Sequence, residues 1–479
     1  MTDIRYVCLS DTHLGEESSL LTNLKTASFD PDPLQPSPVL KQLVKCLRYI
    51  IKQNKNKKKP TLILNGDILE LALTTYNQAA MGFERFIELI MPKGNELFEK
   101  IIYVPGNHDH HLWESARETQ YVDYMAGIKP KEELSIPWHT TNIFMDSSPK
   151  QVPLYFLTRL VRRYPHLKSL VIFASYPNYG LRTRSGKKCV IFHHGHLIES
   201  IYRLMSILKT MVFPDRKEPD NIWDLEAENF AWIDFFWSTM GRSGEAGQDI
   251  EMVYENIRDE KQMKKMLYNL SESLAKRYDL PGWGDKMEAA ILKKVFNLLV
   301  DWTFKSERII SERRLSEDAE KGLWWYMNVP LRNQLINECK ERKWEVPSVV
   351  SFVFGHTHKP FEEDLNFKKY PGWVDVYNTG GWVVDNVNPQ AIYGGSVLLL
   401  DEELNAASVR MYAEEVESEK YIVKVMEAIH AGENHTPFSQ RIEGLVNPEA
   451  DPWKTFSTTA ARSVNIRAQN LRAKMNERS

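Results

Sequence analysis

The sequence predicts an α/β fold interrupted by a helical subdomain, and three observations support this. Apolar strand-like runs alternate with helical patterns over the first 110 residues, strands return from residue 348, and residues 197–346 show almost no strand pattern. Such alternation implies a largely parallel sheet with right-handed crossovers. A chain of 479 residues is long enough for this core and a large insertion.

The individual elements follow from local patterns. Runs of apolar and β-branched residues bounded by turn formers predict strands at 4–11, 61–67, 100–107, 167–175, 187–194, 348–356 and 374–383, and a hairpin over 394–414. Apolar residues at helical spacing predict helices at 39–53, 81–100 and 152–164. The stretch "DPDPLQPSP" (30–38) is expected to be a loop. The basic, poorly patterned end "WKTFSTTAARSVNIRAQNLRAKMNERS" is expected to be a frayed terminus.

This pattern divides the chain into four segments. Residues 1–196 and 347–414 are the two parts of the core, residues 197–346 a helical insert, and residues 415–479 a helical and irregular tail. Within the insert, "LIESIYRLMSILKTMVF" and "MEAAILKKVFNLLVDWTF" have helical period. The insert is rich in tryptophan, with Trp223, Trp232, Trp237, Trp283, Trp302, Trp324, Trp325 and Trp344.

Composition and charge exclude some classes of protein. The chain is 43% hydrophobic and 26% charged, with a net charge of −3, which argues against a surface built as a whole for nucleic acid. The four scattered cysteines form no C-x-x-C pair and predict reduced core thiols. The N-terminus runs directly into a strand, and no apolar run is long enough to span a membrane. We therefore expect a cytoplasmic protein.

Five of the expected strands end in short polar clusters. The clusters are Asp11 with His13, Asp67 with Glu70, Asn107 with His108 and Asp109, "HHGH" at 193–196, and His356 with His358. In α/β sheets, ligands collect outside the carboxyl ends of the strands. The five clusters can therefore reach one common crevice.

The residue types in these clusters indicate metal chemistry. Imidazole, carboxylate and amide donors bind borderline-to-hard divalent ions, so we expect Mn, with Fe, Zn or Mg as alternatives. The clusters hold more donors than one ion needs, which is typical of two ions that share a carboxylate.

The ordered set "DTH", "GD", "GNHD", "HGH" and "GHTH" resembles the calcineurin-like metallophosphoesterases over about residues 5–195 and 348–414. The resemblance implies a four-layer αββα sandwich of two mixed sheets with a dinuclear metal site. One metal would be held by Asp11, His13 and His358. The other would be held by Asn107, His194 and His356, with Asp67 as the bridge between them.

The resemblance also implies roles for residues that bind no metal. His108 would face the phosphate as a general acid or a stabiliser of developing charge, oriented by Asp109. Glu70 is expected to fix the loop or a neighbouring ligand, and His193 to pack on the other face of its strand. His110 and His111 are interpreted as supporting or surface residues. His196 either lies near the phosphate or begins the following helix.

The substrate stays open at this stage. The chain has "GDILEL" and "GNHD", unlike the "GDYVDRG" and "GNHE" of protein phosphatases. A helical insert after "HGH" resembles the UDP-diacylglucosamine pyrophosphatase branch, although this insert is far longer than such a lid. A nuclease, with "RLVRRYPHLK" and "RTRSGKK" tracking the backbone of a nucleic acid, is an alternative. A non-catalytic scaffold for a partner protein is a third. We expect a phosphohydrolase acting on a phosphodiester or pyrophosphate bond; the sequence does not indicate an oligomeric state.

Overall fold

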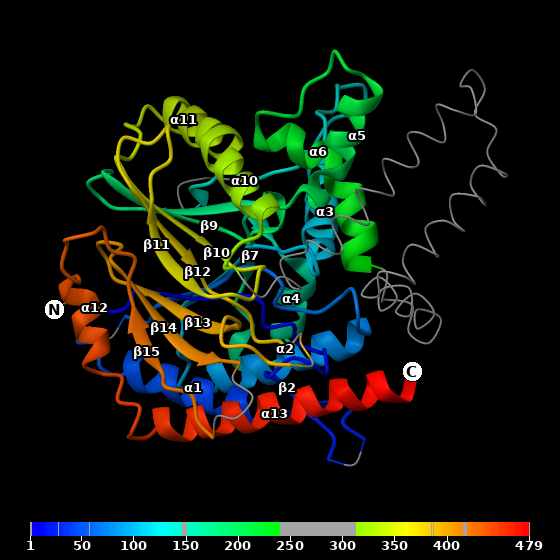
Figure 1. Cartoon of the computed structure of the whole chain (residues 1–479). Helices are drawn as coiled ribbons and strands as arrows, with labels where there is room; N and C mark the ends of the chain where they lie inside the picture. The colour runs from blue at the N-terminus through cyan, green and yellow to red at the C-terminus, as the bar shows by residue number, and fades with distance from the viewer. Residues whose placement is uncertain are drawn as a thin grey trace.

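The computed structural model describes residues 2–26, 28–56, 58–145, 151–239, 313–384, 386, 388–414 and 419–478. The predicted helical segment 287–304 and the residues Trp283 and Trp302 lie outside the described residues. Figure 1 shows a body built on two sheets, with helices on the outer side of each.

The first sheet has eight strands in the order β15-β14-β13-β1-β4-β5-β7-β6. Their bounds are β1 Tyr6–Leu9, β4 Thr61–Leu64, β5 Lys100–Tyr103, β6 Val152–Pro153, β7 Ile172–Ala174, β13 Gly394–Leu400, β14 Ala406–Ala413 and β15 Lys424–Met426. The four strands β1, β4, β5 and β7 run parallel, and the others pair antiparallel. The predicted parallel centre is therefore confirmed, with antiparallel additions at both edges.

The second sheet has five strands in the order β11-β12-β10-β9-β8. Their bounds are β8 Asn178–Arg182, β9 Lys188–His193, β10 Val349–Phe354, β11 Phe361–Leu365 and β12 Val374–Asn378. Strand β10 pairs parallel with both β9 and β12, so residues on either side of the insert lie next to each other in one sheet.

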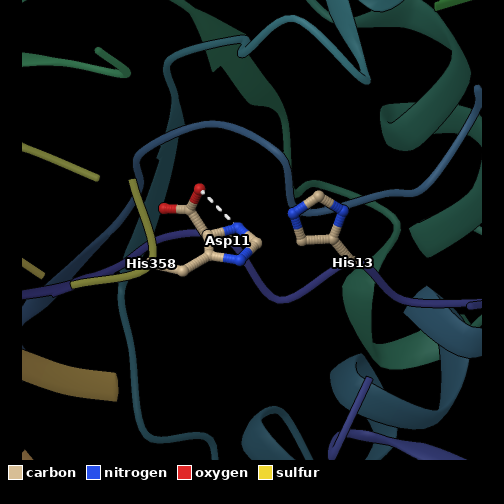
Figure 2. A group of neighbouring side chains, drawn as sticks. All are labelled: Asp11, His13 and His358. Atoms are coloured by element: carbon tan, nitrogen blue, oxygen red, sulfur yellow. Dashed lines mark ion pairs between the residues drawn. The ribbon is translucent and has the colours of Figure 1, made fainter. Parts of the chain in front are cut away.

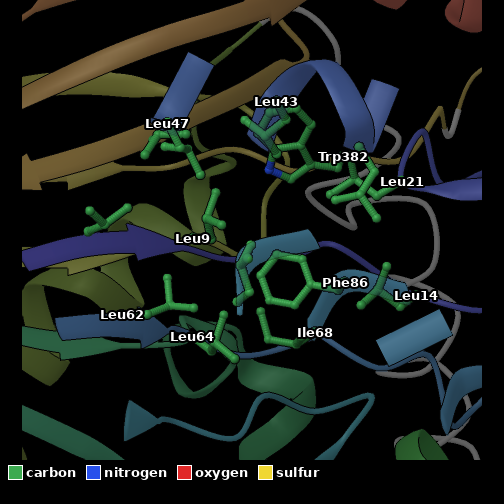
Figure 3. Packing of buried hydrophobic residues seen from close by; sticks show 14 of the residues in the cluster. Leu9, Leu14, Leu21, Leu43, Leu47, Leu62, Leu64, Ile68, Phe86 and Trp382 are labelled. Carbon is green, nitrogen blue, oxygen red and sulfur yellow. The ribbon is translucent and has the colours of Figure 1, made fainter. Parts of the chain in front are cut away.

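Hydrophobic side chains on both faces of the sheets hold the layers together. Val7 and Leu9 of β1 belong to a core that includes Leu43 and Phe86, and Figure 3 shows part of it. The intervening Cys8 belongs to a separate core together with Val353 of β10, between the two sheets. Because successive side chains of a strand point to opposite faces, this alternation sets the order helices, sheet, sheet, helices. The predicted sandwich of two mixed sheets is confirmed.

Helices α1 (Pro38–Ile51), α2 (Tyr76–Ile90) and α4 (Tyr155–Val161) contribute to the core on the outer side of the first sheet. Helix α1 illustrates why they form. The Ser37 side chain caps its start by accepting a hydrogen bond from the Leu40 amide, and Pro38 occupies the first turn, where its missing N–H costs nothing. Leu40, Leu43 and Leu47 then recur at helical spacing and are buried.

The sequence predictions for residues 30–38 and for the C-terminal end are wrong. The Pro-rich stretch at 30–38 contains a strand, β3 (Pro31–Pro36), which pairs with β2 (Thr22–Leu24) as a separate ribbon. Proline is tolerated there because this two-stranded ribbon consists only of edge strands. The basic end is not frayed but forms the long helix α13 (Trp453–Arg478), which packs along α1 (Figure 1). Trp453 and Phe456 are buried, which hydrophobic periodicity alone did not reveal.

Most of the described residues of the segment 197–346 are helical. They include the 3-10 helix η4 (Ser200–Arg203), α5 (Leu204–Val212), α6 (Ile222–Trp232), the π-helix η5 (Ile233–Thr239), α10 (Glu317–Tyr326), the π-helix η7 (Met327–Leu331) and α11 (Arg332–Glu341). Its apolar residues, among them Leu225 and Leu323, share a core with Phe352 of the second sheet. Among the described helices, none combines the length and the apolar composition that a membrane crossing requires.

Candidate metal centre

The seven predicted metal ligands lie just beyond the carboxyl ends of β1, β4, β5, β9 and β10. All seven are at most 2% exposed: Asp11, His13, Asp67, Asn107, His194, His356 and His358. The two segments separated by the insert thus deliver their polar residues to the same buried region, which explains why the clusters recur at strand ends.

A first group of potential ligands consists of Asp11, His13 and His358 (Figure 2), whose donor atoms lie within 4.8 Å of one another. His358 Nε2 lies 3.5 Å from Asp11 Oδ1. Asp11 Oδ1 also accepts a hydrogen bond of 2.8 Å from the amide of His356, and His13 Nδ1 lies 2.8 Å from Glu70 Oε2. The three side chains predicted to hold one metal are therefore together.

A second group consists of Asp67, His194 and His356, again with donor atoms within 4.8 Å. His194 Nε2 lies 3.1 Å from Asp67 Oδ2 and 3.1 Å from Asn107 Oδ1. The same Asp67 oxygen lies 3.8 Å from His13 Nε2 of the first group. Asp67 therefore stands between the two groups, the position that a bridging carboxylate requires.

The donor atoms fit a bound cation. Asp11 Oδ2 and His13 Nε2 are buried, and neither makes a hydrogen bond among the described residues. Two glycines leave room for these carboxylates. A Cβ at Gly106 would come within 2.2 Å of Asp67 Oδ1, and a Cβ at Gly355 would come within 2.0 Å of Asp11 Oδ2. Buried polar atoms normally have partners, so this arrangement is the one expected of a metal site.

Backbone strain is concentrated at the same residues. The φ angles of five predicted ligands fall in the left-handed region: Asp11 49°, His13 42°, Asp67 50°, His356 67° and His358 58°. For residues other than glycine this conformation is uncommon and costs on the order of 1 kcal/mol each. Such strain clusters at functional sites, where the surrounding structure enforces it.

The electrostatics of the site favour positive charge. Burial alone would raise the pKa of the Asp67 carboxyl, but His194 and His108 hold it well below its usual range. Burial would likewise lower the pKa of His194, yet the Asp67 and Asp11 carboxylates raise it to about 9. A buried group of ionised carboxylates therefore favours a cation, whether a proton on imidazole or a metal ion.

His108 lies next to these groups, its ring 4.9 Å from that of His13. Its Nδ1 is 2.8 Å from Glu70 Oε2, and the same carboxylate holds His13 Nδ1 at 2.8 Å. We predicted that Asp109 orients His108, and the structure assigns that position to Glu70 instead. Asp109 accepts hydrogen bonds from Tyr103 Oη and from the amides of Gly106 and Ile68, so it fixes the loop. Glu70 was expected to fix the loop or a neighbouring ligand, and its contact with the predicted ligand His13 agrees with this expectation.

Other histidines of the motifs have distinct surroundings. His193 is buried against Tyr326, with ring centroids 4.6 Å apart, as expected of a packing residue. His196 is fully buried and starts a short 3-10 helix, and its Nε2 lies 3.2 Å from Tyr176 Oη. His110 is fully buried rather than at the surface, and it contacts the insert.

Sequence reasoning missed Glu199, whose Oε1 lies 2.5 Å from His356 Nε2. Carboxylates that bind the second nitrogen of a ligating histidine fix its tautomer and orientation. Glu199 directly follows the first helical turn after "HGH", but nothing in the local pattern distinguishes it from a solvated glutamate.

Comparison with known proteins agrees with this geometry. The family model of the calcineurin-like phosphoesterases matches residues 4–249, slightly more than half of the chain. That range ends before His356 and His358, which the structure nevertheless brings to the same site. None of the curated proteins compared with the chain matches it. The chain belongs to the calcineurin-like phosphoesterase family and is a metal-dependent hydrolase of phosphate esters.

Proposed function

We propose that the protein cleaves a phosphodiester or pyrophosphate bond at a dinuclear metal centre. The observation that supports this most directly is the position of Asp67, whose Oδ2 lies 3.1 Å from His194 Nε2 in one group and 3.8 Å from His13 Nε2 in the other. Two divalent ions bound in such groups neutralise the charge of the phosphate and supply an acidified water as the nucleophile.

Seven residues of the chain would bind the two ions. Asp11, His13 and His358 would hold one ion, Asn107, His194 and His356 would hold the other, and Asp67 would be shared by the two. We prefer Mn, because mixed imidazole, carboxylate and amide donors accommodate it, with Fe, Zn or Mg as alternatives.

His108 is the proposed general acid. Because its Nδ1 donates to the Glu70 carboxylate, Nε2 is the atom that can deliver a proton to the leaving oxygen. General acid catalysis of this kind contributes about 10²- to 10⁴-fold to the rate. Glu70 is fully buried and therefore keeps the imidazole in one orientation.

The test compares hydrolysis of bis-p-nitrophenyl phosphate with that of p-nitrophenyl phosphate, with Mn²⁺ added and after chelation. His108→Ala and Asp67→Ala should each lower diester turnover by at least about 100-fold. His435→Ala serves as the control, because this exposed histidine pairs with Glu427 in the C-terminal part of the chain.

Metal-dependent diester turnover that needs both side chains supports the proposal. Further assays with nucleotide pyrophosphates, lipid-linked pyrophosphates and DNA would then distinguish a pyrophosphatase from a nuclease. The absence of turnover in protein that holds two ions per chain would contradict it and favour a scaffold.

A further inference from the structure

The described part of the insert contacts the loop that carries His108 at several points. Helix α3 (His110–Ala126) begins directly after "GNHD", and it packs against the π-helix η5 of the insert. Figure 1 shows α3 beside α6, and Arg117 of α3 lies over the ring of Phe230 of α6. The catalytic loop is therefore supported by chain that lies more than 110 residues later in the sequence.

The first contact is made by Glu226 of α6, which is fully buried. Its Oε1 lies 2.8 Å from His110 Nε2, and its Oε2 accepts a hydrogen bond of 3.0 Å from Tyr176 Oη. Tyr176 Oη in turn lies 3.2 Å from His196 Nε2, in the "HHGH" loop. One carboxylate of the insert thus links two of the loops that carry predicted ligands, those after β5 and β9.

The second contact is made by Ser238 of η5, which is also fully buried. Its hydroxyl accepts a hydrogen bond of 2.9 Å from the His111 amide and donates one of 3.2 Å to the carbonyl of His108. The His111 amide lies in the first turn of α3, where amides have no partner within the helix. Ser238 therefore binds the backbone on both sides of Asp109. π-Helices such as η5 are found frequently at functional sites.

Charge complementarity strengthens the contact. His110 faces Glu226 at Nε2 and Asp234 of η5 at Nδ1, which is 3.7 Å from Asp234 Oδ1. Burial alone would lower the pKa of His110, but Glu226 and Asp234 raise it to about 10. A protonated His110 accordingly donates a hydrogen bond from Nε2 to Glu226 and places its positive charge near the Asp234 carboxylate.

The same cluster does not need a metal ion. The donor atoms of His110, Glu114 and Glu226 lie within 4.8 Å of one another. However, Arg117 forms a two-point ion pair with Glu114, with 2.7 Å between Nε and Oε1, and the His110 imidazolium balances Glu226. A buried carboxylate with such partners is stable as an ion pair, and loss of either partner leaves an uncompensated charge.

We propose that Glu226 and Ser238 are positioning residues through which the insert sets the place of His108 for catalysis. This inference rests on the proposed function, because it assigns the insert a role in the same reaction. Neither residue touches the substrate; each acts through His110 or through the backbone of the loop. A displacement of about 1 Å in a catalytic group can cost about 100-fold in rate.

The test uses the full chain with Glu226→Gln, Ser238→Ala and the control Glu228→Gln. Glu228 lies on the same helix, but its partners are Ser206 and Lys209, both within the insert. Two readouts are needed: kcat and KM for bis-p-nitrophenyl phosphate with Mn²⁺, and hydrogen–deuterium exchange of residues 104–117 in the metal-free protein. Thermal unfolding measures how much of each variant is folded.

We expect Glu226→Gln and Ser238→Ala to lower kcat by about 10- to 100-fold, with KM and bound Mn²⁺ within about twofold of the wild type. Residues 104–117 should exchange faster in both variants, whereas in Glu228→Gln their exchange rate should equal that of the wild type. The proposal is overturned if kcat per folded molecule and loop exchange stay at wild-type values, or if Glu228→Gln has the same effects. If the wild type hydrolyses no diester, the proposed function fails, and the exchange data alone decide whether the insert holds the loop.

Discussion

Glu70 lies 2.8 Å from Nδ1 of His108, and the same carboxylate is 2.8 Å from Nδ1 of the predicted metal ligand His13. One buried side chain thus orients the proposed general acid and a ligand at the same time. The Ala72 and Leu73 amides in turn hold Glu70 Oε1, at 2.8 and 2.9 Å, so its position is fixed by the backbone.

Replacement of this carboxylate should weaken catalysis more than folding. In Glu70→Gln an NH2 group replaces one of the two acceptor oxygens, and it meets other N–H donors whether it faces the Ala72 and Leu73 amides or the two imidazoles. The side chain therefore cannot accept all of these hydrogen bonds. We expect kcat for the diester to fall about 10- to 100-fold and Mn²⁺ affinity to fall by a similar factor. Steady-state kinetics and metal titration measure both. A variant with kcat within twofold of the wild type would show that Glu70 does not orient His108.

Two adjacent histidines offer a matched test of the ligand assignment. His194→Phe should abolish binding of one ion and diester hydrolysis, because it removes the nitrogen 3.1 Å from Asp67. His193→Phe should retain bound metal and kcat within about twofold, since His193 packs against Tyr326 and neither of its nitrogens makes a hydrogen bond among the described residues. Metal content per chain and kcat for the diester, measured for both variants, test the ligand assignment. Equal loss in both variants would contradict the assignment.

The motif residues could be predicted from sequence because each comes directly after an apolar strand, and strand order in an α/β fold directs such residues to one edge. The carboxylates that support these residues, Glu199 and Glu226, could not be predicted in this way. Glu199 has an extended backbone between two short 3-10 helices, and Glu226 lies on α6. The local sequence marks neither as more than an ordinary polar position, and only tertiary packing brings them to His356 and His110. The role of Asp109 was misassigned for the same reason, because its loop contacts depend on Tyr103.

The C-terminal helix should contribute to stability, contrary to the expectation from its composition. Arg467 is 5% exposed and donates to the carbonyls of Ser19 and Thr22 at 2.9 and 2.7 Å. In Arg467→Met both carbonyls lose a buried partner, so unfolding should become easier by about 2 to 6 kcal/mol. Denaturant unfolding measures the change.

Arg462→Met is the control, because Arg462 is exposed on the same helix. Its free energy of unfolding should stay within about 0.5 kcal/mol of the wild type. Comparable losses in the two variants would mean that helix α13 is sensitive to charge rather than anchored by Arg467.

The His110 cluster predicts a pH dependence of stability. The pKa of His110 is raised from its ordinary 6.5 to about 10, so the folded state binds a proton that the unfolded state releases. The resulting stabilisation is fully present below about pH 6.5 and is lost as the pH rises through about 10. The difference in melting temperature between the wild type and His110→Gln should therefore shrink between pH 6.5 and 10. A difference that is constant with pH would show that His110 is not protonated in the folded protein.

The most direct test of the account is a titration of metal-free protein with Mn²⁺ while hydrolysis of bis-p-nitrophenyl phosphate is followed. Because Asp67 lies between two complete groups of donors, we predict that activity rises until two equivalents are bound and then stays constant. Full activity at one equivalent, or no hydrolysis with both ions bound, would contradict the dinuclear mechanism.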